Sequence, residues 1–110
     1  MRVDGQWDIV QSNGFRVTVN IGQNGDTLTV QASHSGGQVH SIEPTTGSVS
    51  NTHIDLTITW SDGSKGQYTG DLTPNKFALP GFRLVGETHD LNHPGSHASW
   101  ESEGRNFEPV

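Results

Sequence analysis

The stretch GFRVTVNIGQNGDTLTVQASH, residues 14–34, contains two runs in which apolar and polar side chains alternate. The apolar positions are every second residue: Phe15, Val17, Val19 and Ile21, then Leu28, Val30 and Ala32. A period of two is typical of β-strands, because successive side chains of a strand point to opposite faces. The dipeptide Asn24-Gly25 between the runs favours a tight turn. The stretch therefore predicts an antiparallel hairpin with one apolar face.

The same pattern continues along the chain. HIDLTITW, residues 53–60, alternates in the same way, and Asn13-Gly14 and Asp62-Gly63 indicate further turns. No long window keeps a helical period, and residues 72–81, with two prolines, predict a loop. Weaker strands are expected at 7–10, 38–42, 67–72, 82–89 and 97–102, and residues 103–110 are expected to form a C-terminal tail.

About eight short strands with one apolar face predict an all-β fold, because no long stretch of the sequence has a helical period. A single open sheet would leave the apolar face and both edges in water, whereas closure into an up-and-down barrel removes both problems. A two-sheet β-sandwich is the alternative. We expect a single domain over residues 1–110, with bulk for the interior supplied by Trp7, Phe15, Leu28, Ile58, Trp60, Tyr68, Phe82 and Trp100.

The composition limits the classes of partner. The chain has 110 residues, with 6 Lys plus Arg against 12 Asp plus Glu, and a formal net charge of −6. Without a basic stripe, neither nucleic acid nor an anionic membrane is an expected partner. The absence of cysteine excludes disulfides and thiolate zinc sites, and no cofactor is predicted. The start of the chain lacks an apolar signal sequence, so we expect a cytoplasmic protein, with secretion by an unrecognised route left open.

Several short motifs follow one another in a suggestive order. Gly5-x-Trp7, FRVT at 15–18, LTITW at 56–60, GQYTG at 66–70 and a late WES at 100–102 occur along the chain. This order resembles the avidin/streptavidin family, a group of calycin-type β-barrels. The resemblance implies an eight-stranded up-and-down barrel that holds a small ligand at one mouth and often forms homo-oligomers.

The resemblance extends to the barrel wall and not to the residues that read biotin. Trp60 and Trp100 match the family's aromatic walls in kind. The family's Asn after the first Trp and the Ser that follows it correspond here to Ile9 and Asn13, and its Tyr-x-Ser falls near Ala32 and His34. Its late acidic residue falls near Asn106. Biotin is therefore not the expected ligand.

Three histidines are concentrated in THDLNHPGSHASW, residues 88–100. Pro94-Gly95 disfavours the helix that would align them as metal ligands, so residues 90–96 are expected to form a polar loop. A loop of this length places His89 opposite His97, both facing outward, and no metal site is assigned. A genuine metal site and, after it, catalysis are the alternatives, and the outward histidines could also bind zinc or nickel adventitiously.

The same register has a consequence for the barrel interior. It places Gly86 opposite Trp100, where the missing side chain would leave room for the indole. It also requires Trp100 to face inward, together with Leu84 and Phe82.

His34 follows the inward positions of its strand and should point into the barrel mouth. A histidine there can form a hydrogen bond with a ligand or titrate near neutral pH, and a partly solvated histidine at a strand end is the alternative. Asp8 and Asp55, with Asp71, could suggest a carboxylate pair for acid–base catalysis, but each alternates with inward apolar neighbours and is expected on the outer face.

These patterns favour non-enzymatic binding of a small organic molecule or sugar in the mouth of the barrel, including lectin-like recognition. An isomerase or cyclase that uses His34 or Tyr68 for proton transfer is one alternative. A protein-interaction module with a filled core is the other. No catalytic residue is assigned, and the candidate ligand-binding residues are Trp7, Asn13, His34, Trp60, Tyr68, Phe82 and Trp100.

Overall fold

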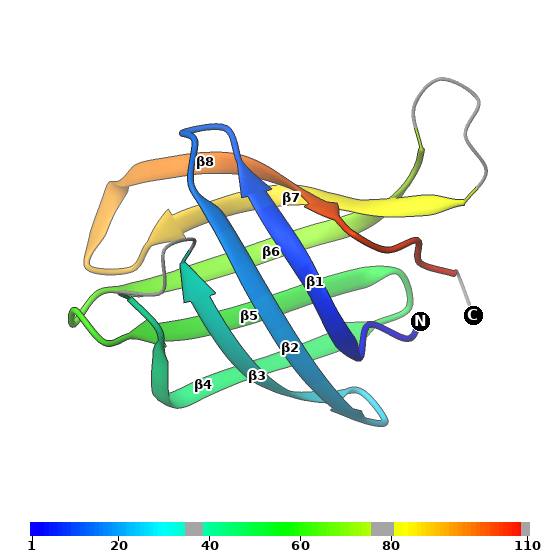
Figure 1. Ribbon diagram of the computed structural model, residues 1–110, viewed down its shortest axis with the longest axis horizontal. Coiled ribbons are helices and arrows are strands. Elements are labelled where there is room, and N and C mark those ends of the chain that lie inside the picture. The colour runs from blue at the N-terminus through cyan, green and yellow to red at the C-terminus, as the bar shows by residue number, and fades with distance from the viewer. Residues whose placement is uncertain (35–38, 76–80, 109–110) are drawn as a thin grey trace.

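The alternating stretches form strands that follow one another around a closed antiparallel barrel (Figure 1). The computed structural model describes residues 1–34, 39–75 and 81–108. Within these ranges no helix is long and apolar enough to cross a membrane. The strands are β1 (Gly5–Gln11), β2 (Arg16–Asn24), β3 (Thr27–His34), β4 (Ser41–Ser50), β5 (His53–Trp60), β6 (Lys65–Pro74), β7 (Phe82–Asp90) and β8 (His93–Glu103).

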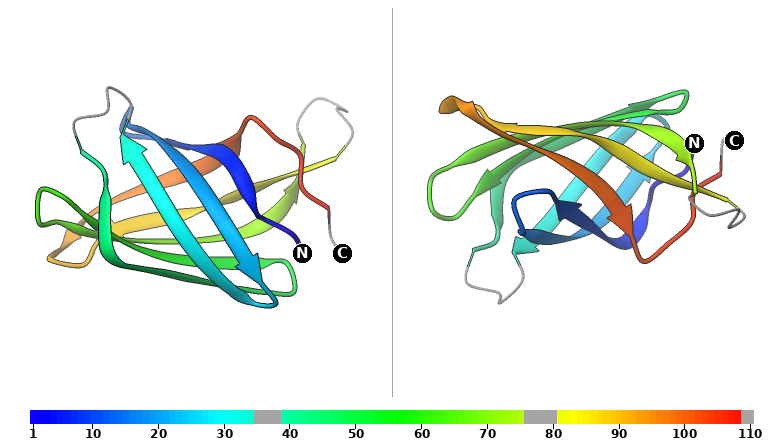
Figure 2. Two further views of the ribbon diagram at one scale, coloured as in Figure 1. Left: turned by 60° about the horizontal axis from the view of Figure 1, so that its bottom comes forward. Right: turned by 90° about the horizontal axis from the view of Figure 1, so that it is seen from above.

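Closure depends on the pairing of the first strand with the last. β1 runs antiparallel to β8, with Asp8 opposite Glu103 and Gln11 opposite Trp100. The sheet therefore has no end strand, and Figure 2 shows the closed ring from two further directions. The predicted eight-stranded up-and-down barrel is confirmed, and the alternative sandwich is wrong because all strands belong to one closed sheet.

Inward-facing side chains pack the centre of the barrel. The apolar residues that the alternation places inward on β2, β3 and β5 are buried. Trp7 stacks on Trp100 with ring centroids 6.4 Å apart, and Phe107 meets Trp7 edge to face at 5.2 Å. These contacts fill the end of the barrel at which β1 begins.

The C-terminal segment contributes to this closed end. β8 ends at Glu103, close to the predicted start of the tail. The backbone N–H of Phe107 then donates a hydrogen bond of 2.9 Å to the carbonyl of Phe82, and the Phe107 side chain is fully buried. The segment thus folds back against the barrel, and its aromatic ring becomes part of the core.

The fourth strand differs from its prediction. The sequence predicts a strand at 38–42, whereas β4 covers Ser41–Ser50, and Gln38 lies outside the described residues. Pro44 and Gly47 are residue types that lower strand propensity, so the alternation is obscured there. Pro44 falls within an irregularity between Ile42 and Thr46 in the pairing of β4 with β5, and Gly47 pairs regularly with Leu56.

The last hairpin is tighter than predicted. The sequence predicts a loop at 90–96, but β8 already begins at His93, which pairs with Asp90. The register shifts between His89 and Asp90, so residues that favour turns are taken up as an irregularity within the strand. Beyond it the predicted pairing of His89 with His97 is confirmed.

The predicted pairing of Gly86 with Trp100 is also confirmed, but its physical reason is different. An added Cβ at Gly86 would lie 1.7 Å from the carbonyl oxygen of Thr69 on β6. At Gly70 an added Cβ would lie 2.7 Å from Cζ2 of Trp100. Gly70 therefore makes room for the indole, and Gly86 permits the close approach of β7 to β6.

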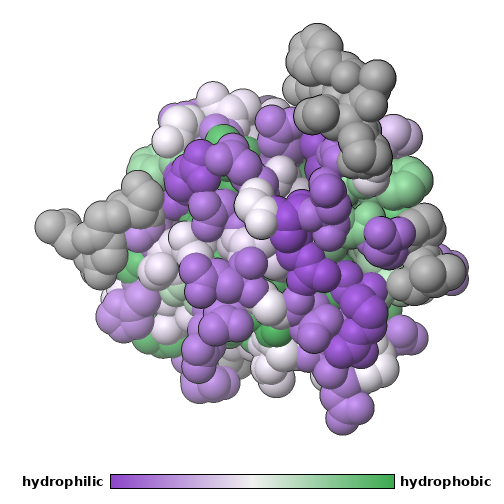
Figure 3. All heavy atoms as spheres, turned by 45° about the vertical axis from the view of Figure 1, so that its right-hand side comes forward, coloured by the Kyte–Doolittle hydropathy of each residue, from purple (hydrophilic) through white to green (hydrophobic). Residues whose placement is uncertain are grey.

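Polar side chains cover the outer wall, as the hydrophilic face in Figure 3 shows. Arg16 forms an ion pair with Asp8 at 2.7 Å, and Nδ1 of His53 lies 3.0 Å from Oδ1 of Asp71. Asp55 lies between buried neighbours on β5 and also faces outward. The predicted outer position of all three aspartates is confirmed.

Replacing Gly86 by alanine is expected to destabilise the barrel by about 3 kcal/mol or more, because the new Cβ overlaps backbone that cannot move without separating two strands. Gly95→Ala is the matched control, since an added Cβ there meets nothing within 4 Å, and it should change stability by about 0.5 kcal/mol or less. Urea denaturation measures both variants. Equal effects of the two substitutions would contradict this account of Gly86.

Candidate functional site

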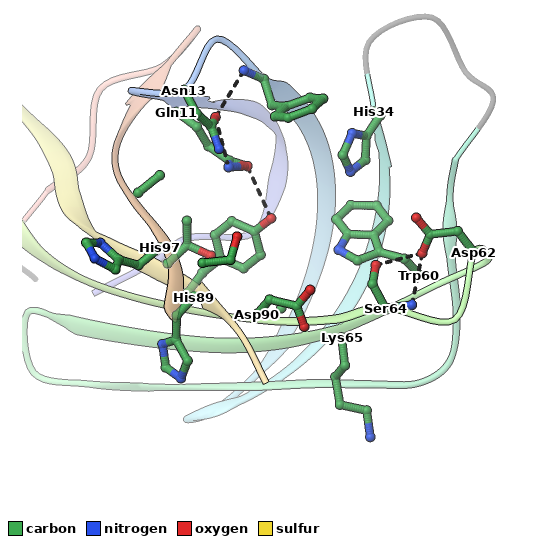
Figure 4. Close-up of a pocket in the computed structure, with 16 residues that line it drawn as sticks. Gln11, Asn13, His34, Trp60, Asp62, Ser64, Lys65, His89, Asp90 and His97 are labelled. Atoms are coloured by element: carbon green, nitrogen blue, oxygen red, sulfur yellow. Dashed lines mark hydrogen bonds between the residues drawn. The ribbon is translucent and has the colours of Figure 1, made fainter. Parts of the chain in front are cut away.

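The end of the barrel opposite Phe107 opens into a pocket (Figure 4). Its cavity has a volume of about 160 Å³ and is continuous with open solvent. Its walls include the inward-facing residues closest to the open end of several strands, among them Gln11, His34, Trp60 and Asp90. The alternation that fills the barrel therefore also selects which side chains face the pocket.

Three aromatic rings form one wall of the pocket. The ring of His34 meets Trp60 edge to face with centroids 4.5 Å apart, and Phe15 meets His34 at 5.5 Å. Trp60 lies at the base of this row, and Phe15 lies at the rim. The wall offers ring surfaces of the kind that organic ligands contact.

The structure places Phe15 at the surface and not in the core. Its predicted place in the barrel core is wrong, because its side chain is 55% exposed. Phe15 has the inward phase of β2, but it precedes the first residue of that strand, Arg16, and so it lies beyond the packed interior. It lines the pocket, and its position directly after the Asn13-Gly14 turn is the signal that places it at a rim.

The indole N–H of Trp60 has no acceptor among the described residues, although the side chain is only 4% exposed. The other two tryptophans differ. Trp7 donates to the carbonyl of Val3 at 3.0 Å, and Trp100 donates to the carbonyl of Glu87 at 3.1 Å. In Figure 4 the nitrogen edge of Trp60 faces the pocket, so the free donor is directed at the space where a ligand would lie.

Gly66 keeps this donor accessible. A Cβ added at Gly66 would lie 3.6 Å from Nε1 of Trp60 and 3.2 Å from Cε1 of Tyr68. Any side chain here would therefore crowd the space beside the indole N–H. Gly66 pairs with Asp90 across β6 and β7, which leaves the carboxylate without a bulky neighbour on that side.

A short chain of polar groups continues the wall of the pocket from the Phe15 end of the aromatic row (Figure 4). The hydroxyl of Tyr68 donates to Oε1 of Gln11 at 3.3 Å, and Nε2 of Gln11 donates to Oδ1 of Asn13 at 3.5 Å. Burial raises the pKa of Tyr68 to about 12, against a smaller opposing effect of a hydrogen bond with Thr88. Tyr68 is therefore a neutral hydrogen-bonding group at physiological pH.

Two carboxylates add negative charge to the pocket. Hydrogen bonds from the side chain and backbone of Ser64, at 2.6 and 2.9 Å, lower the pKa of Asp62. A backbone hydrogen bond from Asn92 at 2.8 Å lowers the pKa of Asp90. Both groups are therefore ionised at neutral pH. The ammonium group of Lys65 points away from the pocket, although the residue contributes to its wall (Figure 4).

The predicted ligand-binding residues lie at different depths in the barrel. Asn13, His34, Trp60 and Tyr68 all line the pocket. Trp100 lies deeper, with its ring 6.5 Å from that of Tyr68. The remaining two residues lie toward the closed end, as their contacts with Phe107 show: Trp7 and Phe82.

The histidine-rich stretch does not form a metal cluster with its neighbours. His89 and His97 come from opposite strands, and both rings point away from the pocket (Figure 4). His93 lies 3.4 Å from a carboxylate oxygen of Asp90. Within the described ranges, no three His, Asp or Glu side chains are grouped so that they could hold a metal ion.

The chain shares an eight-stranded antiparallel barrel with calycin-type proteins. No protein-family model matches it, and no curated protein is significantly similar to it in sequence. Homo-oligomer formation, which the avidin/streptavidin resemblance implies, stays a prediction.

His34 should titrate below its usual pKa of 6.5, because burial disfavours the imidazolium form. The carboxylate of Asp62 raises the pKa and so partly opposes this effect. Asp62→Asn, which keeps an oxygen for the Ser64 hydrogen bonds, is expected to lower the pKa of His34 further. An NMR pH titration of the imidazole C–H signals measures both values.

Asp26→Asn is the matched control for this titration. Asp26 is exposed in the turn between β2 and β3, at the other end of the barrel, and its loss removes the same net charge. It should leave the pKa of His34 unchanged. A pKa above 6.5, or equal effects of the two substitutions, would contradict the proposed environment of His34.

Proposed function

We propose that the protein binds a small organic ligand in the mouth pocket and does not transform it. The single observation that supports this most directly is the indole N–H of Trp60, which has no acceptor among the described residues and faces the pocket. The N–H is open to the pocket, so it is available to a ligand, and a neutral hydrogen bond of this kind contributes about 0.5–1.5 kcal/mol. A ligand oxygen or nitrogen beside this edge of the indole would accept the hydrogen bond in place of water.

The composition of the walls also supports binding. A row of rings together with a few neutral hydrogen-bonding groups is the usual lining of pockets for small molecules and sugars. The Gln11 and Asn13 amides can serve as donor or acceptor toward hydroxyl groups. A sugar ring or a small heterocycle fits this chemistry, and a lectin-like specificity is included in the proposal.

The enzyme alternative receives less support. A general base should have a pKa near the working pH, and the pKa of Tyr68 at about 12 is far from it. His34 has a lowered pKa and is mostly neutral at pH 7, but no hydrogen bond between the described residues orients its ring for proton transfer. Binding therefore accounts for the pocket with fewer assumptions.

The proposal is tested by NMR titration with a panel of neutral monosaccharides, disaccharides and heterocycles. The three indole N–H signals serve as internal probes. A ligand in the mouth is expected to shift the signal of Trp60 by forming the missing hydrogen bond. The chemical shifts of the Trp7 and Trp100 signals should change little, since both N–H groups already donate hydrogen bonds to backbone carbonyls.

Trp60→Phe provides the variant, because it keeps an aromatic ring and removes the donor. It is expected to weaken a bound ligand roughly tenfold, which is the value of about one hydrogen bond. His53→Ala, on the outer wall at the other end of the barrel, is the control and should leave the affinity unchanged. If ligands shift other resonances but never that of Trp60, the mouth pocket is not the binding site.

A further inference from the structure

We infer that the ligand of the mouth pocket is a small organic cation that also carries an oxygen acceptor. This inference rests on the proposed function, since it specifies the charge and polar group of the ligand that the pocket would take. It follows from the two carboxylates, the aromatic wall and the free donor of Trp60, which lie together at one end of the barrel.

The charge at the mouth is negative. Asp90 is the last inward-phase residue of β7, and it lines the pocket together with Trp60 and Tyr68 (Figure 4). Asp62 lies beside His34. The ammonium of Lys65 is directed outward, so it does not neutralise the interior of the pocket. The net charge of −6 adds a long-range field of the same sign.

The aromatic rings suit an organic cation better than a metal ion. Alkylated ammonium groups bind against ring surfaces through cation–π attraction and through burial of their methyl groups. Phe15, exposed at the rim, offers an apolar ring that such methyl groups can cover. A bare metal ion would instead need several oxygen or nitrogen ligands, and the described residues offer no such group of three.

The free donor of Trp60 supplies the second requirement. A cation alone would leave the indole N–H unpaired, whereas an anion would satisfy it but would be repelled by Asp62 and Asp90. A molecule with a cationic group and a hydroxyl or carbonyl oxygen matches all three features. Amino alcohols and alkylated amino acids are members of this chemical class.

The test compares choline with 3,3-dimethylbutan-1-ol, a neutral molecule of the same shape that keeps the hydroxyl group. Both are titrated at pH 8, where His34, whose pKa is lowered by burial, is neutral. Choline is expected to shift the indole N–H signal of Trp60 and to bind about tenfold tighter than the alcohol, in line with a partly desolvated cation–π and carboxylate site. Its affinity should fall as salt is added.

Asp90→Asn tests the role of charge within the site. The amide keeps an oxygen for the Asn92 hydrogen bond, so the variant should fold, as judged by its spectrum. It is expected to lose most of the preference for choline over the alcohol. Asp26→Asn, which removes the same charge from the exposed turn at the opposite end, should keep the preference.

Three results would overturn the inference. The first is equal affinity for choline and the neutral alcohol, and the second is tighter binding of the matching anion, 3,3-dimethylbutanoate. In both of these cases the pocket still binds ligands, so the proposed function stands and only its charge preference falls. The third is no response to choline at millimolar concentrations, in which case the proposed function is decided separately by the neutral panel.

Discussion

The pairing of β1 with β8 is the constraint on which the rest of the structure depends. It turns a chain of hairpins into a ring, so every inward side chain must share one interior. That interior has two ends, and they differ. At one end Phe107 folds in and packs on Trp7. At the other end, polar and aromatic side chains occupy the inward positions closest to the opening and line a pocket.

The two ends also differ in how their polar groups are satisfied. Toward the closed end the Trp7 indole donates to a backbone carbonyl, and the Trp100 indole does the same deeper in the barrel. At the open end the Trp60 indole has no such acceptor among the described residues. Paired indole donors belong to the packed part of the core, and an unpaired donor that faces the pocket beside carboxylates is available to a partner molecule.

Much of the fold could be predicted from the sequence, because alternation and Asn-Gly or Asp-Gly turns are local signals. They place the strands, and their phase places His34 at the mouth. What could not be predicted depends on contacts between distant segments. Nothing local shows that Phe107 returns to the core, that Gly70 and not Gly86 makes room for an indole, or which tryptophan keeps a free N–H.

The most direct test of the account is the rate at which the three indole N–H protons of the ligand-free protein exchange with solvent, since protection reports hydrogen bonding and burial together. The account predicts fast exchange for Trp60, whose donor faces an open pocket, and slow exchange for Trp7 and Trp100. If Trp60 is as strongly protected as the other two, its donor is not free and the mouth is not the site described above.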